Sequence, residues 1–146
     1  MCIRDSPSSG SIISYIQAHG TDNLHADFGE NPDYGIPFVV VPVDQPLVQI
    51  VYDAYGDESD PGPFPIPLDA PVEGGGDRHV IALRQGTCDL FELYGGRRQG
   101  GGWVGCRGGP VCLGTHAPRP PGWTSADAAG LPTHPRRGHT VRGGGG

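Results

Sequence analysis

Three short groups of polar residues in this chain could bind a ligand or carry out acid–base chemistry. His25 and Asp27 are spaced as HxD, Asp77-Arg78-His79 is spaced as DxH, and residues 57–60 (DESD) hold three carboxylates. Imidazole and carboxylate groups at such spacings can share a metal ion or move a proton, and carboxylates beside aromatic rings are typical of carbohydrate sites. These groups therefore supply the candidate functional residues.

The candidate residues fall into a catalytic set and a binding set. The catalytic set is His79, Asp77 and Asp60. The binding set is His25, Asp27, Trp103 and Trp123.

Each group also has a purely structural interpretation. His25 and Asp27 can cap a turn, residues 57–60 can form a solvated loop, and Asp77 can pin Arg78 at the start of a hairpin. The sequence has no GxSxG elbow, HExxH helix, Walker A loop or GxGxxG fingerprint. Whether the protein is an enzyme is therefore left open by the sequence.

The cysteines do not indicate a metal centre. The four cysteines include no CxxC, and Cys106 and Cys112 with His116 match none of the common zinc-ligand spacings. We interpret them as unpaired or artefactual thiols, and we predict neither a metal nor another cofactor.

Composition and charge limit the classes of partner. The chain of 146 residues has room for one domain with a modest core, and it contains 26 glycines and 16 prolines. Residues 1–95 carry 15 acids and 3 bases, whereas residues 96–146 carry 1 acid and 7 bases. The arginines are not interleaved with aromatic residues, so we expect no nucleic-acid partner. No run of 18 apolar residues occurs, so we expect no membrane partner either.

The candidate residues must be positioned by a small number of elements. Residues 9–20 predict a short helix that Ser11 caps and Gly20 ends, and residues 36–42 and 46–55 predict strands. Residues 60–67 alternate prolines, so they predict an extended loop over the surface or along a sheet edge, with almost no backbone donors to the sheet.

The strongest element is a hairpin. Residues 79–84 and 88–94 are apolar on both faces and are joined through Gln85-Gly86, where glycine supplies the positive φ of a tight turn. Strands buried on both faces belong in a sandwich. The predicted fold is mainly β: an incomplete antiparallel β-sandwich or jelly-roll-like domain with one short N-terminal helix.

Several long motifs resemble a known family. HADFG, YGIPFVVVP, DESDPGPFPIPLDAPVEGG, DRHV, CDLFELY and RPPGWTSADAAGLP resemble a largely uncharacterised family of secreted bacterial and fungal proteins. The resemblance covers roughly residues 10–103 and 119–132. It implies a β-rich fold and export from the cell, and it implies no established activity.

The chain also departs from the family pattern. Arg84 replaces an acid, residues 104–118 have a foreign composition, and the sequence after residue 132 differs from the family's further strands. We interpret these spans as products of frame slips, and the MCIRDS start as a translated adapter. The expected divisions are a non-native start (1–8), a partial β-rich domain (9–103), an irregular span (104–118), a loop with one helical turn (119–132) and a disordered tail (133–146).

The function hypothesis follows from the strands, the aromatic residues and the acidic loops. We expect an extracellular domain that binds or acts on carbohydrate, with a polysaccharide as partner. The alternative is a non-catalytic structural or surface module, or a truncated fragment without function. The sequence leaves the oligomeric state open.

Overall fold

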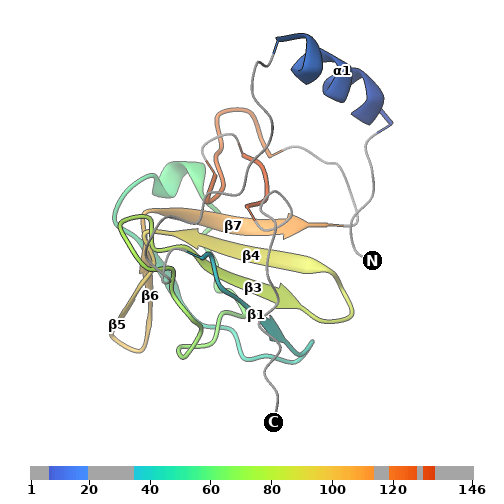
Figure 1. Ribbon diagram of the computed structural model, residues 1–146. Coiled ribbons are helices and arrows are strands. Elements are labelled where there is room, and N and C mark those ends of the chain that lie inside the picture. Colours follow the sequence, from blue (N-terminus) through green and yellow to red (C-terminus); the bar gives the residue numbers. More distant parts are fainter. Residues whose placement is uncertain (1–6, 20–34, 114–118, 128–129, 134–146) are drawn as a thin grey trace.

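The computed structural model describes residues 7–19, 35–113, 119–127 and 130–133, and it is mainly β with one short α-helix (Figure 1). This confirms the predicted fold class at that level. The elements in chain order are α1 (Ser9–His19), β1 (Phe38–Val41), β2 (Ile50–Tyr52), the 3₁₀ turn η1 (Gly56–Glu58), β3 (Val80–Arg84), β4 (Asp89–Tyr94), β5 (Arg97–Gln99), β6 (Gly102–Gly105) and β7 (Arg107–Cys112).

The strands form two mixed sheets. One sheet has the order β1-β3-β4-β7 and the other has the order β2-β6-β5. The pairs β1–β3 and β2–β6 are parallel, and the other pairs are antiparallel. The expectation of a purely antiparallel sandwich is therefore wrong for two pairs. Their partners are separated by long connections, which permit the chain to return in the same direction.

The predicted hairpin is confirmed. β3 and β4 pair antiparallel with Ala82 opposite Phe91, and Gly86 in the turn has a φ of 85°. Phe91 is 7% exposed and Ile81 is fully buried. Alternate residues of the two strands enter different apolar clusters on the two faces of the sheet, which explains why both strands carry apolar residues on both faces.

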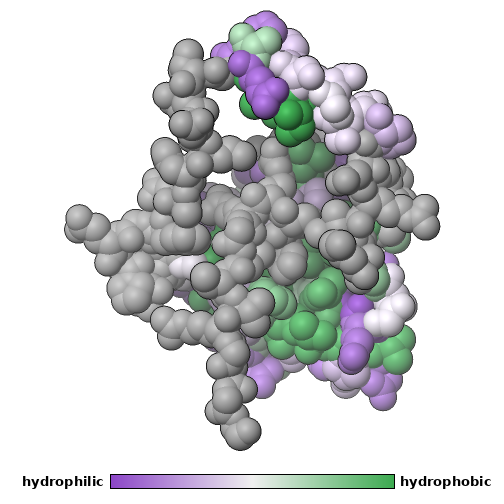
Figure 2. All heavy atoms as spheres, turned by 45° about the vertical axis from the view of Figure 1, so that its right-hand side comes forward, coloured by the Kyte–Doolittle hydropathy of each residue, from purple (hydrophilic) through white to green (hydrophobic). Residues whose placement is uncertain are grey.

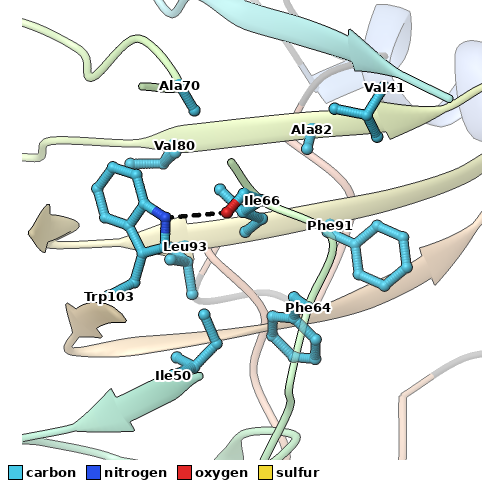
Figure 3. Packing of buried hydrophobic residues seen from close by; sticks show 10 residues of the cluster. All are labelled: Val41, Ile50, Phe64, Ile66, Ala70, Val80, Ala82, Phe91, Leu93 and Trp103. Atoms are coloured by element: carbon cyan, nitrogen blue, oxygen red, sulfur yellow. Dashed lines mark hydrogen bonds between the residues drawn. The ribbon is translucent and has the colours of Figure 1, made fainter. Parts of the chain in front are cut away.

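The main core lies between the two sheets (Figure 3). Trp103 of β6 is fully buried there, and its indole Nε1 donates a hydrogen bond to the carbonyl oxygen of Ile66 at 3.2 Å. Because both sheets supply side chains to one cluster, the arrangement is sandwich-like. The cluster comprises Val41, Ile50, Phe64, Ile66, Ala70, Val80, Ala82, Phe91, Leu93 and Trp103.

The proline-rich loop is only partly as predicted. It makes one bridge with the chain before β2, in which Val48 and Phe64 exchange backbone hydrogen bonds of 2.8 and 3.0 Å, and it forms no longer ladder. The expected surface position is wrong, because Phe64, Pro65 and Ile66 are buried. Proline has no N–H to leave unsatisfied, so this loop can enter the core and contribute its apolar side chains there.

The span 104–118 was expected to be irregular, and this is wrong for its first part. β6 runs to Gly105, and all six residues of β7 pair with β4. The expectation relied on the scarcity of apolar side chains, but strand pairing uses backbone groups. A Cβ on Gly108 would lie 2.4 Å from the carbonyl oxygen of Glu92, so the absence of a side chain there permits the close approach. Residues 114–118 lie outside the described part.

The N-terminal helix is confirmed, although it begins at Ser9, so Ser11 lies inside it. None of its residues is buried, and Ile12, Ile13 and Ile16 are more than half exposed. Figure 2 shows that hydrophobic side chains also gather on the face of the molecule that lies below this helix. No helix in the described ranges is long and apolar enough to span a membrane.

The segment after residue 118 forms turns in its described parts, 119–127 and 130–133, and these contain no helix. Ser125 Oγ accepts a hydrogen bond from the N–H of Asp127 at 3.1 Å and donates one to the carbonyl oxygen of Leu131 at 2.8 Å. Such side-chain-supported turns are a common role for serine. The predicted helical turn includes residues 128–129, which lie outside the described part, so it stays a prediction. The predicted divisions 1–8 and 133–146 fall almost wholly outside the described residues.

Candidate functional site

Polar side chains gather at one end of the outer face of the four-stranded sheet. Leu93 of β4 points into the core, so its neighbour Tyr94 points outward. Tyr94 pairs with Arg107 of β7, and its ring contacts the ring of His79 edge-on, with 5.5 Å between the ring centroids. Opposed residues of neighbouring strands project to the same face. We call this group, with Glu73, Asp77 and Tyr55, the His79 cluster.

The partner of His79 is Glu73. His79 Nδ1 makes a short contact with Glu73 Oε2, and the same oxygen accepts the backbone N–H of His79 at 3.2 Å. The Glu73 N–H in turn donates to the His79 carbonyl oxygen at 2.9 Å. The side chains of His79 and Glu73 are only 7% and 8% exposed. The carboxylate thus fixes the orientation of a buried imidazole.

Asp77 lies at the exposed rim of the cluster. The Tyr94 hydroxyl donates a hydrogen bond of 3.4 Å to Asp77 Oδ1. The negative charge of Asp77, with burial as a smaller cause, raises the pKa of Tyr94 above its ordinary value. A neutral Tyr94 hydroxyl is therefore retained as a hydrogen-bond donor well into the alkaline range.

This arrangement predicts the effect of Asp77→Asn. The substitution removes the charge that disfavours the tyrosinate, so the pKa of Tyr94 should fall toward its ordinary value. The measurement is an NMR titration of the tyrosine Cζ resonances, with Tyr94→Phe to assign the signal. An unchanged pKa of Tyr94 in the Asp77→Asn protein would contradict the contact.

Arg107 lies between two aromatic rings. Its guanidinium carbon is 4.4 Å from the ring centroid of Tyr55 and 5.4 Å from that of Tyr94. Tyr55 precedes η1, has a φ of 48° and is 50% exposed. The cluster therefore combines two tyrosine rings, a cation and a carboxylate at an accessible end of the sheet.

Asp60 does not join this cluster. It forms an ion pair with Arg119, and its backbone N–H donates to the Gly108 carbonyl oxygen at 3.2 Å. A Cβ on Gly109 would lie 2.4 Å from Asp60 Oδ2, so the ion pair lies directly on β7. No hydrogen bond or ion pair connects Asp60 with His79 in the described ranges. The predicted catalytic set is therefore divided between two places.

Asp60 belongs to a set of acids that hold the segment after residue 118 against the sheet. Thr124 donates a hydrogen bond of 3.1 Å to Glu58, and the backbone N–H of Thr133 donates one of 2.7 Å to the buried Glu92. Figure 1 shows this segment next to β7. The carboxylates of residues 57–60 therefore have a structural role here, apart from Asp57, which is exposed.

Tyr52 lies behind this ion pair. Its hydroxyl is buried without a hydrogen-bond partner among the described residues. Burial, with the charge of Asp60 as the second cause, raises the pKa of Tyr52 far above its ordinary value. The group is therefore held neutral and enclosed.

The predicted binding residues have different outcomes. Trp103 is a core residue and has no exposed ring face, so its prediction as a binding residue is wrong. Trp123 is half-buried, and the Arg119 guanidinium lies 5.4 Å from its ring centroid. His25 and Asp27 lie outside the described residues.

Two further observations concern metals. No group of three or more His, Cys, Asp or Glu side chains in the described ranges is arranged to hold a metal ion. Cys106 is a free thiol, whereas Cys88 is disulfide-bonded, so the interpretation of the cysteines as unpaired thiols is wrong for Cys88.

Comparison with known proteins returned no relative. No family model, no curated protein and no solved structure matches the chain.

Proposed function

We propose that this chain is an extracellular carbohydrate-binding domain and that its ligand lies on the His79 cluster. The observation that supports the proposal is the grouping of Tyr55, Tyr94, Arg107 and Asp77 at one accessible end of the sheet. A sugar ring offers an apolar C–H face that packs on a tyrosine ring, and hydroxyls that pair with a carboxylate or guanidinium. The extracellular location rests on the family resemblance alone.

Binding is favoured over hydrolysis by the contacts of the suspected catalytic groups. Glycoside hydrolysis uses two carboxyl groups that flank the scissile bond. Glu73 is engaged by His79, Asp60 is engaged by Arg119, and the His79 side chain is nearly closed to solvent. A general base must come within hydrogen-bond reach of its substrate. Asp77 is the exposed carboxylate of the cluster, and we assign it to ligand contact.

The test is a titration of the chain against a panel of soluble polysaccharides by isothermal calorimetry. We expect one or more to bind, and Tyr55→Ala to weaken that binding by about tenfold, since an aromatic contact contributes about 0.5–1.5 kcal/mol. The matched control is Tyr15→Ala, because Tyr15 is 66% exposed on α1. This control should bind as the unchanged chain does.

Two results would contradict the proposal. One is a folded chain that binds no polysaccharide, which would favour a non-catalytic structural module. The other is equal binding by the Tyr55→Ala and unchanged proteins, which would place the ligand elsewhere.

A further inference from the structure

Arg107 differs from the other arginines of the described residues. Arg78, Arg84, Arg97, Arg98 and Arg119 each donate a hydrogen bond to a carbonyl, hydroxyl or carboxylate oxygen. Within the same ranges the side chain of Arg107 makes no hydrogen bond and no ion pair, and its Nε is buried without a partner. Its guanidinium instead lies against the two tyrosine rings.

The surroundings hold this cation in place without neutralising it. Ring faces attract a guanidinium but supply no hydrogen-bond acceptor in its plane, where its N–H groups point. Asp77, the exposed acid of the cluster, accepts the Tyr94 hydroxyl and makes no ion pair with Arg107. An arginine stacked between aromatic rings with its N–H groups unused is suited to a planar or tetrahedral oxyanion.

From this we infer that Arg107 recognises an oxyanion on the saccharide, so that the ligand is an acidic glycan. The inference rests on the proposed carbohydrate-binding function and narrows its ligand class. The anion is a uronate carboxylate or a sulfate ester, which offer the same acceptor oxygens. Tyr55 and Tyr94 then contact the sugar ring, and the Arg107 guanidinium binds the anionic group of the saccharide.

The first test compares charged and neutral forms of one polymer with the unchanged chain. Polygalacturonate is titrated against its methyl ester, and dextran sulfate against dextran. We expect one charged polymer to bind at least about tenfold more tightly than its neutral form, with an affinity that falls as salt is added. If the chain prefers polygalacturonate to its methyl ester, the anion is a carboxylate. If it prefers dextran sulfate to dextran, the anion is a sulfate.

The second test uses substitutions. Arg107→Gln should abolish the preference for the charged polymer, whereas Arg107→Lys should keep part of it, because lysine keeps the charge but not the planar fork. The control is Arg84→Gln, since Arg84 lies at the other end of β3 and pairs with Asp89. This variant should retain the preference.

The outcomes separate the inference from the function on which it rests. Equal binding of the charged and neutral polymers by the unchanged chain would overturn the acidic-glycan inference and leave carbohydrate binding intact. Binding of neither would overturn both. A preference that survives in a folded Arg107→Gln protein would show that another cation carries it, and would also overturn the inference.

Discussion

Replacing Trp103 with alanine should lower the free energy of unfolding by about 3–5 kcal/mol, the usual cost of removing a fully buried large aromatic side chain. The ring contacts the core supplied by both sheets, and its loss also leaves the Ile66 carbonyl oxygen without its 3.2 Å donor. The measurement is chemical denaturation followed by circular dichroism. The result would confirm that Trp103 stabilises the fold, in place of the predicted binding role.

Trp123 supplies the matched control. It is half-buried and contacts Arg119 through its ring face, so Trp123→Ala should cost only about 1 kcal/mol. The chain has two tryptophans, so Trp123→Phe leaves Trp103 as the single indole emitter. Its fluorescence should be blue-shifted and resistant to acrylamide. Ready quenching in that folded variant would contradict the burial of Trp103.

The sequence predicts well the elements that are determined by residues close together in the chain. The β3–β4 hairpin follows from two apolar runs around Gly86, and α1 follows from a short stretch between Ser9 and Gly20. The sequence does not predict the parallel pairing of β1 with β3. About forty residues separate the two strands, and no local pattern determines whether the second strand runs parallel or antiparallel to the first. The sequence also does not predict the burial of Phe64 and Ile66, because alternating prolines usually indicate an exposed segment.

The same limit applies to the contacts around the candidate site residues. Asp77 and His79 are candidates from the sequence because they stand at the mouth of the hairpin. Glu73, which holds His79, is separated from it by a glycine-rich turn, and only the folded backbone brings the two together. Arg119 lies 59 residues from its partner Asp60, so nothing local in the DESD run reveals that this carboxylate is engaged.

Substitution of Glu73, the partner of His79, should also cause a large loss of unfolding free energy. Both side chains are almost fully buried, so Glu73→Leu leaves an imidazole without its acceptor and should cost about 3–5 kcal/mol of unfolding free energy. His79→Phe, which retains a ring, should cost less than this but leave the carboxylate unpaired. The exposed neighbour provides the control, and Asp77→Asn should change stability by less than about 0.5 kcal/mol.

A double-mutant cycle separates the pair from simple packing loss. The double variant Glu73→Leu/His79→Phe removes both polar groups and restores apolar contact, so it should be more stable than the sum of the single losses predicts, by more than about 1 kcal/mol. Strictly additive losses would show that the two side chains do not interact. A double variant that is more stable than the sum predicts would instead show that Glu73 holds the imidazole beside Tyr94. The reason is that removing either partner alone leaves a buried polar group unsatisfied.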